Sequence, residues 1–181
     1  MKTLTRRMLP LLLLAIVMNY AAPAMAQSED EDEARANAHA KLVDLLDNTD
    51  DLFYKARKDN NGQPFYTLIW EADGETTRMI LGLKQLGYYN GKYVYAISAW
   101  TYVAQSESRL PPAAIKAVAQ ANDSLMIGSY SCSSDFSKIY ANMTGILDGA
   151  TPGSVWMYCA YLHSNKMKLR EAVQQAMAGS R

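Results

Sequence analysis

The stretch LFYKARKDNNGQPFYTLIWEADGETTRMILGLKQLGYYNGKYVYAISAWTYV, residues 52–103, decides the fold of this chain. It is rich in Tyr, Trp, Ile, Val and Thr, the side chains that are enriched in β-strands. Three dipeptides that accept positive φ at tight turns interrupt it, namely Asn61-Gly62, Asp73-Gly74 and Asn90-Gly91. The stretch therefore predicts an antiparallel meander of four strands, at 52–57, 65–71, 76–83 and 92–103.

Helices and a second hairpin are predicted on either side of the meander. Apolar residues at helical spacing and helix-starting prolines indicate three helices, at 34–47, at 113–122 and from Pro152 toward Gly179. Strand-forming residues return at 125–131 and 137–143. Because each helix has an apolar stripe to bury, the predicted fold class is α+β. It is an antiparallel sheet, a meander plus a second hairpin, packed against helices in a two-layer sandwich.

The first 26 residues have the pattern of a cleaved secretory signal peptide. Lys2, Arg6 and Arg7 precede a Leu-rich apolar run, and Ala24-Met25-Ala26 places small residues before Gln27. The run is shorter than the roughly 20 apolar residues of a membrane helix, so no stable membrane insertion is expected after cleavage. The predicted location is the periplasm or the exterior of the cell. Both the ordinary secretory route and a twin-arginine route remain open.

The formal net charge of zero, from 18 bases and 18 acids, averages over unlike segments. Residues 1–26 hold three bases and no acid, so the rest of the chain has 15 bases against 18 acids. Residues 27–36 form an acidic leader, either a solvated segment or a tether for a cation or a basic partner. Residues 37–178 are expected to form a single domain. Since no extended basic patch occurs, nucleic-acid binding is not expected.

No motif for a cofactor, a metal or a catalytic triad is found in the sequence, and no cofactor is predicted. His39 and His163 are far apart and lack a second ligand at metal-binding spacing, so each is predicted to have a surface or capping role. Glu71, Asp73 and Glu75 cluster at a predicted hairpin turn. Solvated turn residues are the expected interpretation, and a general acid/base pair is the alternative.

Cys132 and Cys159 are the only cysteines of the chain. In an exported domain two cysteines favour a disulfide, here one that would link the second hairpin to the last helix. The alternative is a pair of buried thiols that act as small apolar side chains.

Aromatic side chains line both faces of the predicted strand 92–103. Core packing accounts for one of these faces, and the other is a candidate interaction surface for a partner protein or a second copy of the chain. The candidate residues for this surface are Trp70, Tyr93, Tyr95, Trp100 and Tyr102.

The order of these elements resembles that of a known family. The residues that carry the likeness are Leu68-Ile69-Trp70-Glu71, Ala99-Trp100, Asn122, Gly128-Ser129-Tyr130 and Ile139-Tyr140-Ala141. Together with the last helix they look like the YbjN domain family, which is similar in fold to type III secretion chaperones. The resemblance implies a non-catalytic module that binds or regulates other proteins, commonly as a dimer. The alternative function is a periplasmic hydrolase with an unrecognised active site.

Overall fold

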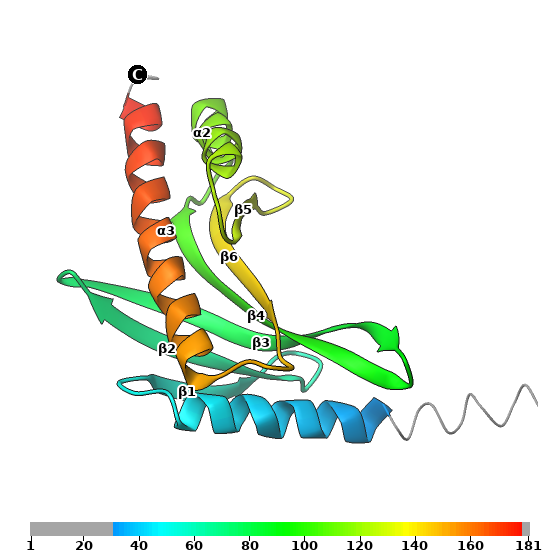
Figure 1. Cartoon of the computed structure of the whole chain (residues 1–181). Coiled ribbons are helices and arrows are strands. Elements are labelled where there is room, and N and C mark those ends of the chain that lie inside the picture. The colour runs from blue at the N-terminus through cyan, green and yellow to red at the C-terminus, as the bar shows by residue number, and fades with distance from the viewer. Residues whose placement is uncertain (1–30, 179–181) are drawn as a thin grey trace, which may run out of the picture. The chain divides into compact units, whose positions relative to one another are not determined.

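The computed structural model describes residues 31–178, which Figure 1 shows as coloured ribbon. The chain divides into a short N-terminal unit that ends at His39 and a main unit that begins at Ala40. In the first, residues 31–39 are helical, including the part of the expected acidic leader that is described. The main unit opens with helical residues 40–47 and contains the whole sheet. The predicted signal peptide lies outside the described residues.

Six antiparallel strands form one sheet in the main unit, in the order β1-β2-β3-β4-β6-β5. Their bounds are β1 Phe53–Lys58, β2 Pro64–Ala72, β3 Glu75–Tyr89, β4 Lys92–Gln105, β5 Ser129–Cys132 and β6 Lys138–Ile146. The three predicted turns are confirmed, because Gly62, Gly74 and Gly91 have φ of 78°, 74° and 78°. The predicted meander and second hairpin thus form one continuous sheet.

The strand predictions differ most from the structure at two places. β5 begins at Ser129, and the preceding residues 125–128 form a loop. Gly128 at the end of that loop has φ of 90°, a conformation that leaves the β region. β3 continues to Tyr89, past its partner β2, so that residues 84–89 pair only with β4. This part of the β3–β4 hairpin is a two-stranded arm, visible in Figure 1.

Two further helices complete the main unit, α2 (Pro112–Asp123) and α3 (Pro152–Ala178). Both begin at a proline, whose missing N–H costs nothing in a first helical turn. At the start of α3, Ser154 N–H donates to Thr151 Oγ1, and Thr151 N–H donates to Ser154 Oγ, both at 3.2 Å. These reciprocal bonds satisfy backbone donors that the first turn would leave unpaired.

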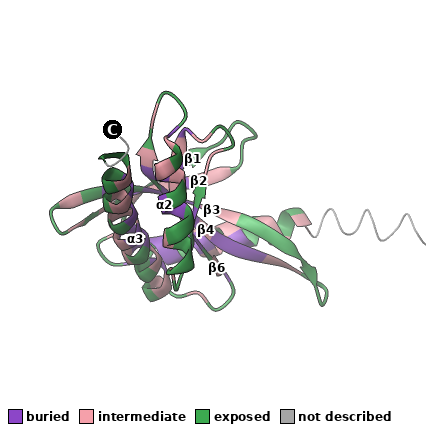
Figure 2. Ribbon diagram, turned by 90° about the horizontal axis from the view of Figure 1, so that it is seen from above, coloured by how far each residue is buried: buried purple, intermediate pink, exposed green. Residues whose placement is uncertain are grey.

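The core lies between the helices and one face of the sheet, which we call the helix-side face. Leu68, Met79 and Leu81 on this face are fully buried, as are Val155 and Leu162 of α3. Figure 2 shows these buried segments where the strands pass beneath the helices. The predicted α+β architecture, a sheet layer and a helix layer, is confirmed. Along the described residues, no helix is both long enough and apolar enough to cross a membrane.

Candidate functional site

The second face of the sheet, which we call the open face, carries an aromatic cluster. Tyr102 of β4 is the cross-strand partner of Tyr140 of β6, with ring centroids 5.1 Å apart. Trp100 meets both tyrosines edge-on, at 5.2 and 5.5 Å. The ammonium group of Lys138 lies 5.8 Å from the centre of the Tyr102 ring, within the range of a cation–π contact. Three aromatic rings and one cation thus meet on an outward-facing surface.

Apolar side chains extend the open face beyond this aromatic cluster. Phe53 of β1 is 80% exposed and pairs with Ile69 of β2, which is 46% exposed. Ile146 at the end of β6 is 57% exposed. Ile80 stands directly opposite Trp100, and its partner in β2 is Thr67. Exposed apolar side chains thus lie on β1, β2 and β6 in addition to the aromatic cluster.

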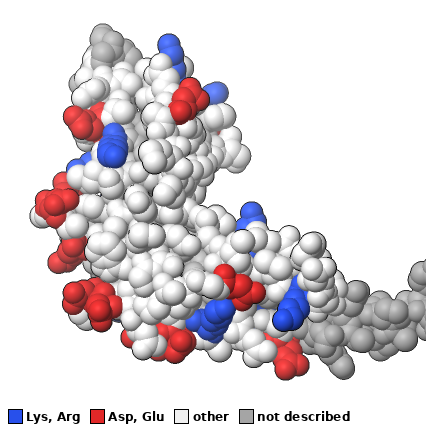
Figure 3. All heavy atoms as spheres, in the orientation of Figure 1, with Lys and Arg blue, Asp and Glu red and all other residues white. Residues whose placement is uncertain are grey.

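The charged side chains of the open face are mostly cationic. Because side chains alternate along a strand, the register assigns each residue of β1, β2, β3 and β6 to one face. The open-face cations are Lys55, Arg57, Arg78, Lys84 and Lys138, against the single acid Glu71. Figure 3, in the orientation of Figure 1, shows Lys and Arg side chains scattered singly over the side of the molecule that is seen. By the strand register, the open face combines aromatic rings with an excess of positive charge.

The five aromatic residues predicted as an interaction surface lie in three different places. Trp100 and Tyr102 lie together on the open face. Tyr93 stacks against Tyr88 on the two-stranded arm, with centroids 4.8 Å apart. Tyr95, although in the same strand, is buried.

Trp70 is the fifth of these residues and belongs to the opposite side of the sheet. It lies on the helix-side face, 5.4 Å from Trp156 of α3 in a T-shaped pair. Its indole N–H is buried without a hydrogen-bond partner. Tyr140 completes the open-face cluster, although the sequence does not predict it as part of that surface. Residue types indicate that Tyr140 lies in a strand, but only the register between β6 and β4 places it beside Tyr102.

Cys132 and Cys159 are free thiols in the structure, so the predicted disulfide is not formed. Cys132 pairs with Ile139 at the start of β6, whereas Cys159 follows Tyr158, whose ring lies against Gly145. Ile139 and Gly145 are six positions apart in β6, about 20 Å along the strand. A disulfide requires the two Cα atoms to lie within about 7 Å. The prediction of a disulfide was wrong because Cys132 of β5 and Cys159 of α3 lie at different positions along the length of β6.

Native-state labelling is expected to distinguish the two thiols. Burial raises the pKa of Cys159 to about 12, and it raises the pKa of the half-buried Cys132 less far. Because the thiolate is the reactive form, Cys159 is expected to resist iodoacetamide at pH 8 until urea unfolds the chain. Mass spectrometry should find at most one label in the native protein and two in the unfolded protein, with the Cys132→Ser variant unlabelled when native. A mass two hydrogens lower, with no reactive thiol in urea, would contradict the structure.

His163 corrects the prediction of a surface or capping role, because its side chain is buried between α3 and the sheet. Its Nδ1 lies 2.9 Å from Thr77 Oγ1, and Lys166 Nζ donates to the same oxygen at 3.3 Å. The Thr77 hydroxyl group thus bridges His163 and Lys166, and the second ring nitrogen of His163, Nε2, is buried without a hydrogen-bond partner.

The contacts of Thr77 with His163 and Lys166 fasten α3 to β3. Thr77 is fully buried. Next to it, Arg170 of α3 forms a bidentate ion pair with Glu75, at 2.8 and 3.3 Å, and this bond lowers the pKa of Glu75. Glu75 belongs to the carboxylate cluster predicted at the β2–β3 turn. In the structure Glu75 is paired with the guanidinium group of Arg170, which favours the ionised form of the carboxylate.

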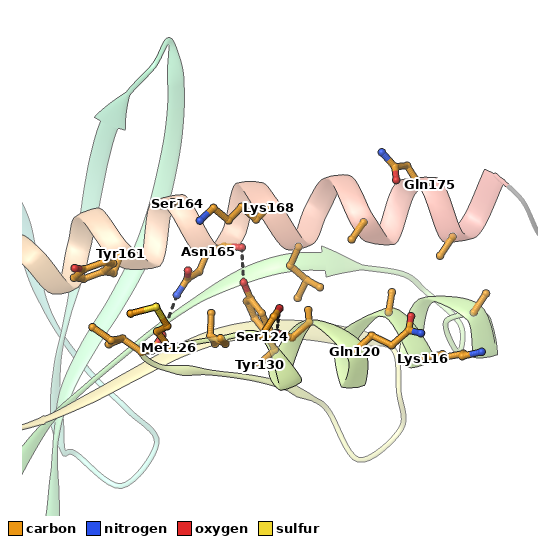
Figure 4. Close-up of a pocket in the computed structure, with 18 residues that line it drawn as sticks. Lys116, Gln120, Ser124, Met126, Tyr130, Tyr161, Ser164, Asn165, Lys168 and Gln175 are labelled. Atoms are coloured by element: carbon orange, nitrogen blue, oxygen red, sulfur yellow. Dashed lines mark hydrogen bonds between the residues drawn. The ribbon is translucent and has the colours of Figure 1, made fainter.

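A groove of about 920 Å³ runs between α2 and α3. One wall is a single stripe of α2, with Ala113, Ala117 and Ala121 at successive turns. The other wall is a stripe of α3 from Tyr161 to Ala176, and residues 124–127 close one end. Figure 4 shows Met126 and Tyr161 at that end, with Lys116 and Gln120 along α2.

Hydrogen bonds hold the closed end of the groove in place. The Asn165 side chain donates to Ile127 O at 3.3 Å, and Tyr130 Oη donates to Asn165 O at 3.1 Å. Both bonds are drawn in Figure 4. The Asn122 side chain also accepts from Tyr130 N–H at 2.7 Å and donates to its carbonyl oxygen at 3.0 Å. The groove is consequently preformed by contacts within the main unit.

The walls of this groove carry no carboxylate, imidazole or thiol group. Among residues 31–178, no three His, Cys, Asp or Glu side chains come together as a metal site. In comparisons with known proteins, the chain matches no protein-family model and no curated protein.

Proposed function

We propose that this chain is a non-catalytic, exported module that binds other proteins through the open face of its sheet, in a regulatory or chaperone-like role. The observation that carries the proposal is the aromatic cluster of Trp100, Tyr102 and Tyr140 on the face of the sheet opposite α3. Tyr and Trp are the side chains most enriched at the centres of protein interfaces, where ring area is buried at low entropic cost.

The chemistry of the open face indicates the kind of partner. Aromatic rings and exposed apolar side chains favour an apolar or aromatic anchor. Five cations against one acid favour carboxylates around that anchor, because complementary charge speeds association and selects partners. The partner is then a protein, or a second copy of this chain, that presents an apolar patch among acidic residues.

The compartment and the family are part of the same proposal. The N-terminal pattern supports a signal peptide cut after Ala26 and a periplasmic or secreted mature protein. The order of elements, with a meander, a helix, a hairpin and a final helix, supports a YbjN-like domain related to type III secretion chaperones. Membership of that family assigns no catalytic residue and is compatible with a site made of a sheet surface.

Site-directed photo-crosslinking tests the proposal. A photo-reactive side chain at Tyr102 is expected to give a covalent adduct in periplasmic extract, either with a partner protein or with a second copy. The same group at Trp156, an exposed tryptophan on the other side of the sheet, is the matched control and should give none. The Trp100→Ala variant should lower the Tyr102 adduct at least tenfold without loss of fold. Equal yields from Tyr102 and Trp156 would refute the proposal.

Light scattering separates the two partner classes. If the open face binds a second copy, the purified chain should be a dimer that becomes a monomer in the Trp100→Ala variant. If the partner is another protein, the purified chain should be a monomer in both forms, and the crosslinked adduct should contain a second polypeptide.

A further inference from the structure

The groove between α2 and α3 is a second surface, and its walls are helices rather than strands. We propose that it binds an amphipathic α-helix of a partner protein, one whose apolar stripe is flanked by Glu or Asp. That the partner is a protein rests on the proposed function, but the groove residues differ from those of the open face. Three properties of the groove carry it: its shape, the size of its wall residues and its charge.

The shape of the groove matches a helix. On α3 the wall residues recur every three or four positions from Tyr161 to Ala176, so they form one straight stripe. At 1.5 Å per residue this stripe is about 22 Å long, the length of a helix of about 15 residues. An extended strand or a compact small molecule would leave most of such a trough unfilled. A linear groove between two helices is the usual seat of a third helix.

Small wall residues allow a third helix to approach closely. Alanines occur on both walls, at Ala117 and Ala121 on α2 and at Ala172 and Ala176 toward the C-terminal end of the α3 wall. Packed helix axes lie about 8–10 Å apart, depending on the facing side chains, and small side chains favour the closer approach. At the closed end, Met126 is 94% exposed, an unusual state for a large apolar side chain held at a preformed site. A flexible methionine can pack against varied apolar side chains of an incoming helix.

The charge of the groove decides between kinds of amphipathic helix. Lys116 on α2 and Lys168 on α3 are its only charged wall residues, one on each side. Asp123 and Glu171 lie outside both stripes, and Glu171 already accepts a hydrogen bond from the Gln175 side chain at 3.4 Å. A bound helix would therefore meet an ammonium group on each flank of its apolar stripe. Carboxylates at those flanks are complementary, and lysines there would be repelled.

A peptide selection tests this inference directly. The probe is a display library of 16-residue peptides with a fixed helical pattern of apolar positions and random residues elsewhere, selected on the purified full chain. Glu and Asp are expected to be enriched at the positions beside the apolar stripe. The Lys116→Glu/Lys168→Glu double variant should reverse this preference and enrich Lys and Arg. The Lys92→Glu variant, changed at the tip of the two-stranded arm, is the control and should keep the acidic preference.

The Ala172→Trp variant blocks the groove and is expected to lower the affinity of the selected acidic peptides at least tenfold, with an unchanged circular dichroism spectrum. Binding that survives Ala172→Trp but disappears in Trp100→Ala would place the peptides on the open face and overturn the inference while leaving the proposed function intact. Selection of peptides without acidic flanks, or no selection at all, would also overturn it. The crosslinking result at Tyr102 does not depend on either groove variant, so the two proposals can fail separately.

Discussion

Replacing Leu68 by alanine is expected to lower the free energy of unfolding by about 2 to 5 kcal/mol. Leu68 is fully buried on the helix-side face and pairs across strands with Met79, which is also fully buried. Truncation removes apolar contact area and leaves a cavity that paired strands on both sides cannot close. Urea unfolding followed by circular dichroism measures the change as a lower midpoint at an unaltered slope.

Two control variants make the Leu68 experiment specific to the cavity. Leu68→Met conserves most of the volume and should cost less than about 1.5 kcal/mol. Leu86→Ala truncates a half-exposed leucine on the two-stranded arm and should change stability by less than about 1 kcal/mol. A loss from Leu68→Ala no larger than that from Leu86→Ala would mean that β2 is not a central strand of the core.

The second large effect is expected for Gly128→Ala, with a loss of more than about 2 kcal/mol. Gly128 has φ of 90°, which strains any other residue, and an added Cβ would lie 2.6 Å from the backbone oxygen of Asn142. Asn142 is the register partner of Ser129, the residue after Gly128. Relief of the clash therefore requires β5 to move away from β6. Urea unfolding gives the size of the loss, and hydrogen exchange should show faster exchange at β5 and β6 first.

Gly62→Ala is the matched control for Gly128→Ala. Gly62 has a similar φ of 78°, but no atom lies within 4 Å of the position of an added Cβ. It should cost only about 1 kcal/mol, the strain of the backbone conformation itself. The difference between the two variants then measures the close approach to Asn142. Equal losses would show that backbone strain alone accounts for both effects.

The loss at Gly128 has a functional consequence. The loop that Gly128 ends also closes the α2–α3 groove through Leu125, Met126 and Ile127. A partly folded Gly128→Ala protein should therefore lose the selected acidic peptides while Tyr102 still gives its crosslinked adduct. Gly128 also explains why the strand predicted at 125–131 begins too early. The apolar residues before Gly128 line the groove and do not pair in the sheet.

Local chemistry was enough to predict the meander, its three turns and the starts of α2 and α3. Asn-Gly and Asp-Gly dipeptides favour the positive φ of tight turns, and a proline begins a helix for reasons contained in its own ring. Alternation along β4 places Trp100 and Tyr102 on one face and Tyr93 and Tyr95 on the other, so the five aromatic residues predicted as one surface do not share a face.

The tertiary structure alone decided which face the helices cover, and with it the character of each site. Trp70 and Trp100 are alike as residues, yet one packs on Trp156 and the other on Tyr140, because α3 crosses one side of the sheet. The same packing buries His163 against Thr77 and keeps Cys132 away from Cys159. Strand register and helix packing bring together residues that are distant in the chain. Neither the hydrophobic periodicity of one segment nor a turn dipeptide specifies which distant residues will meet.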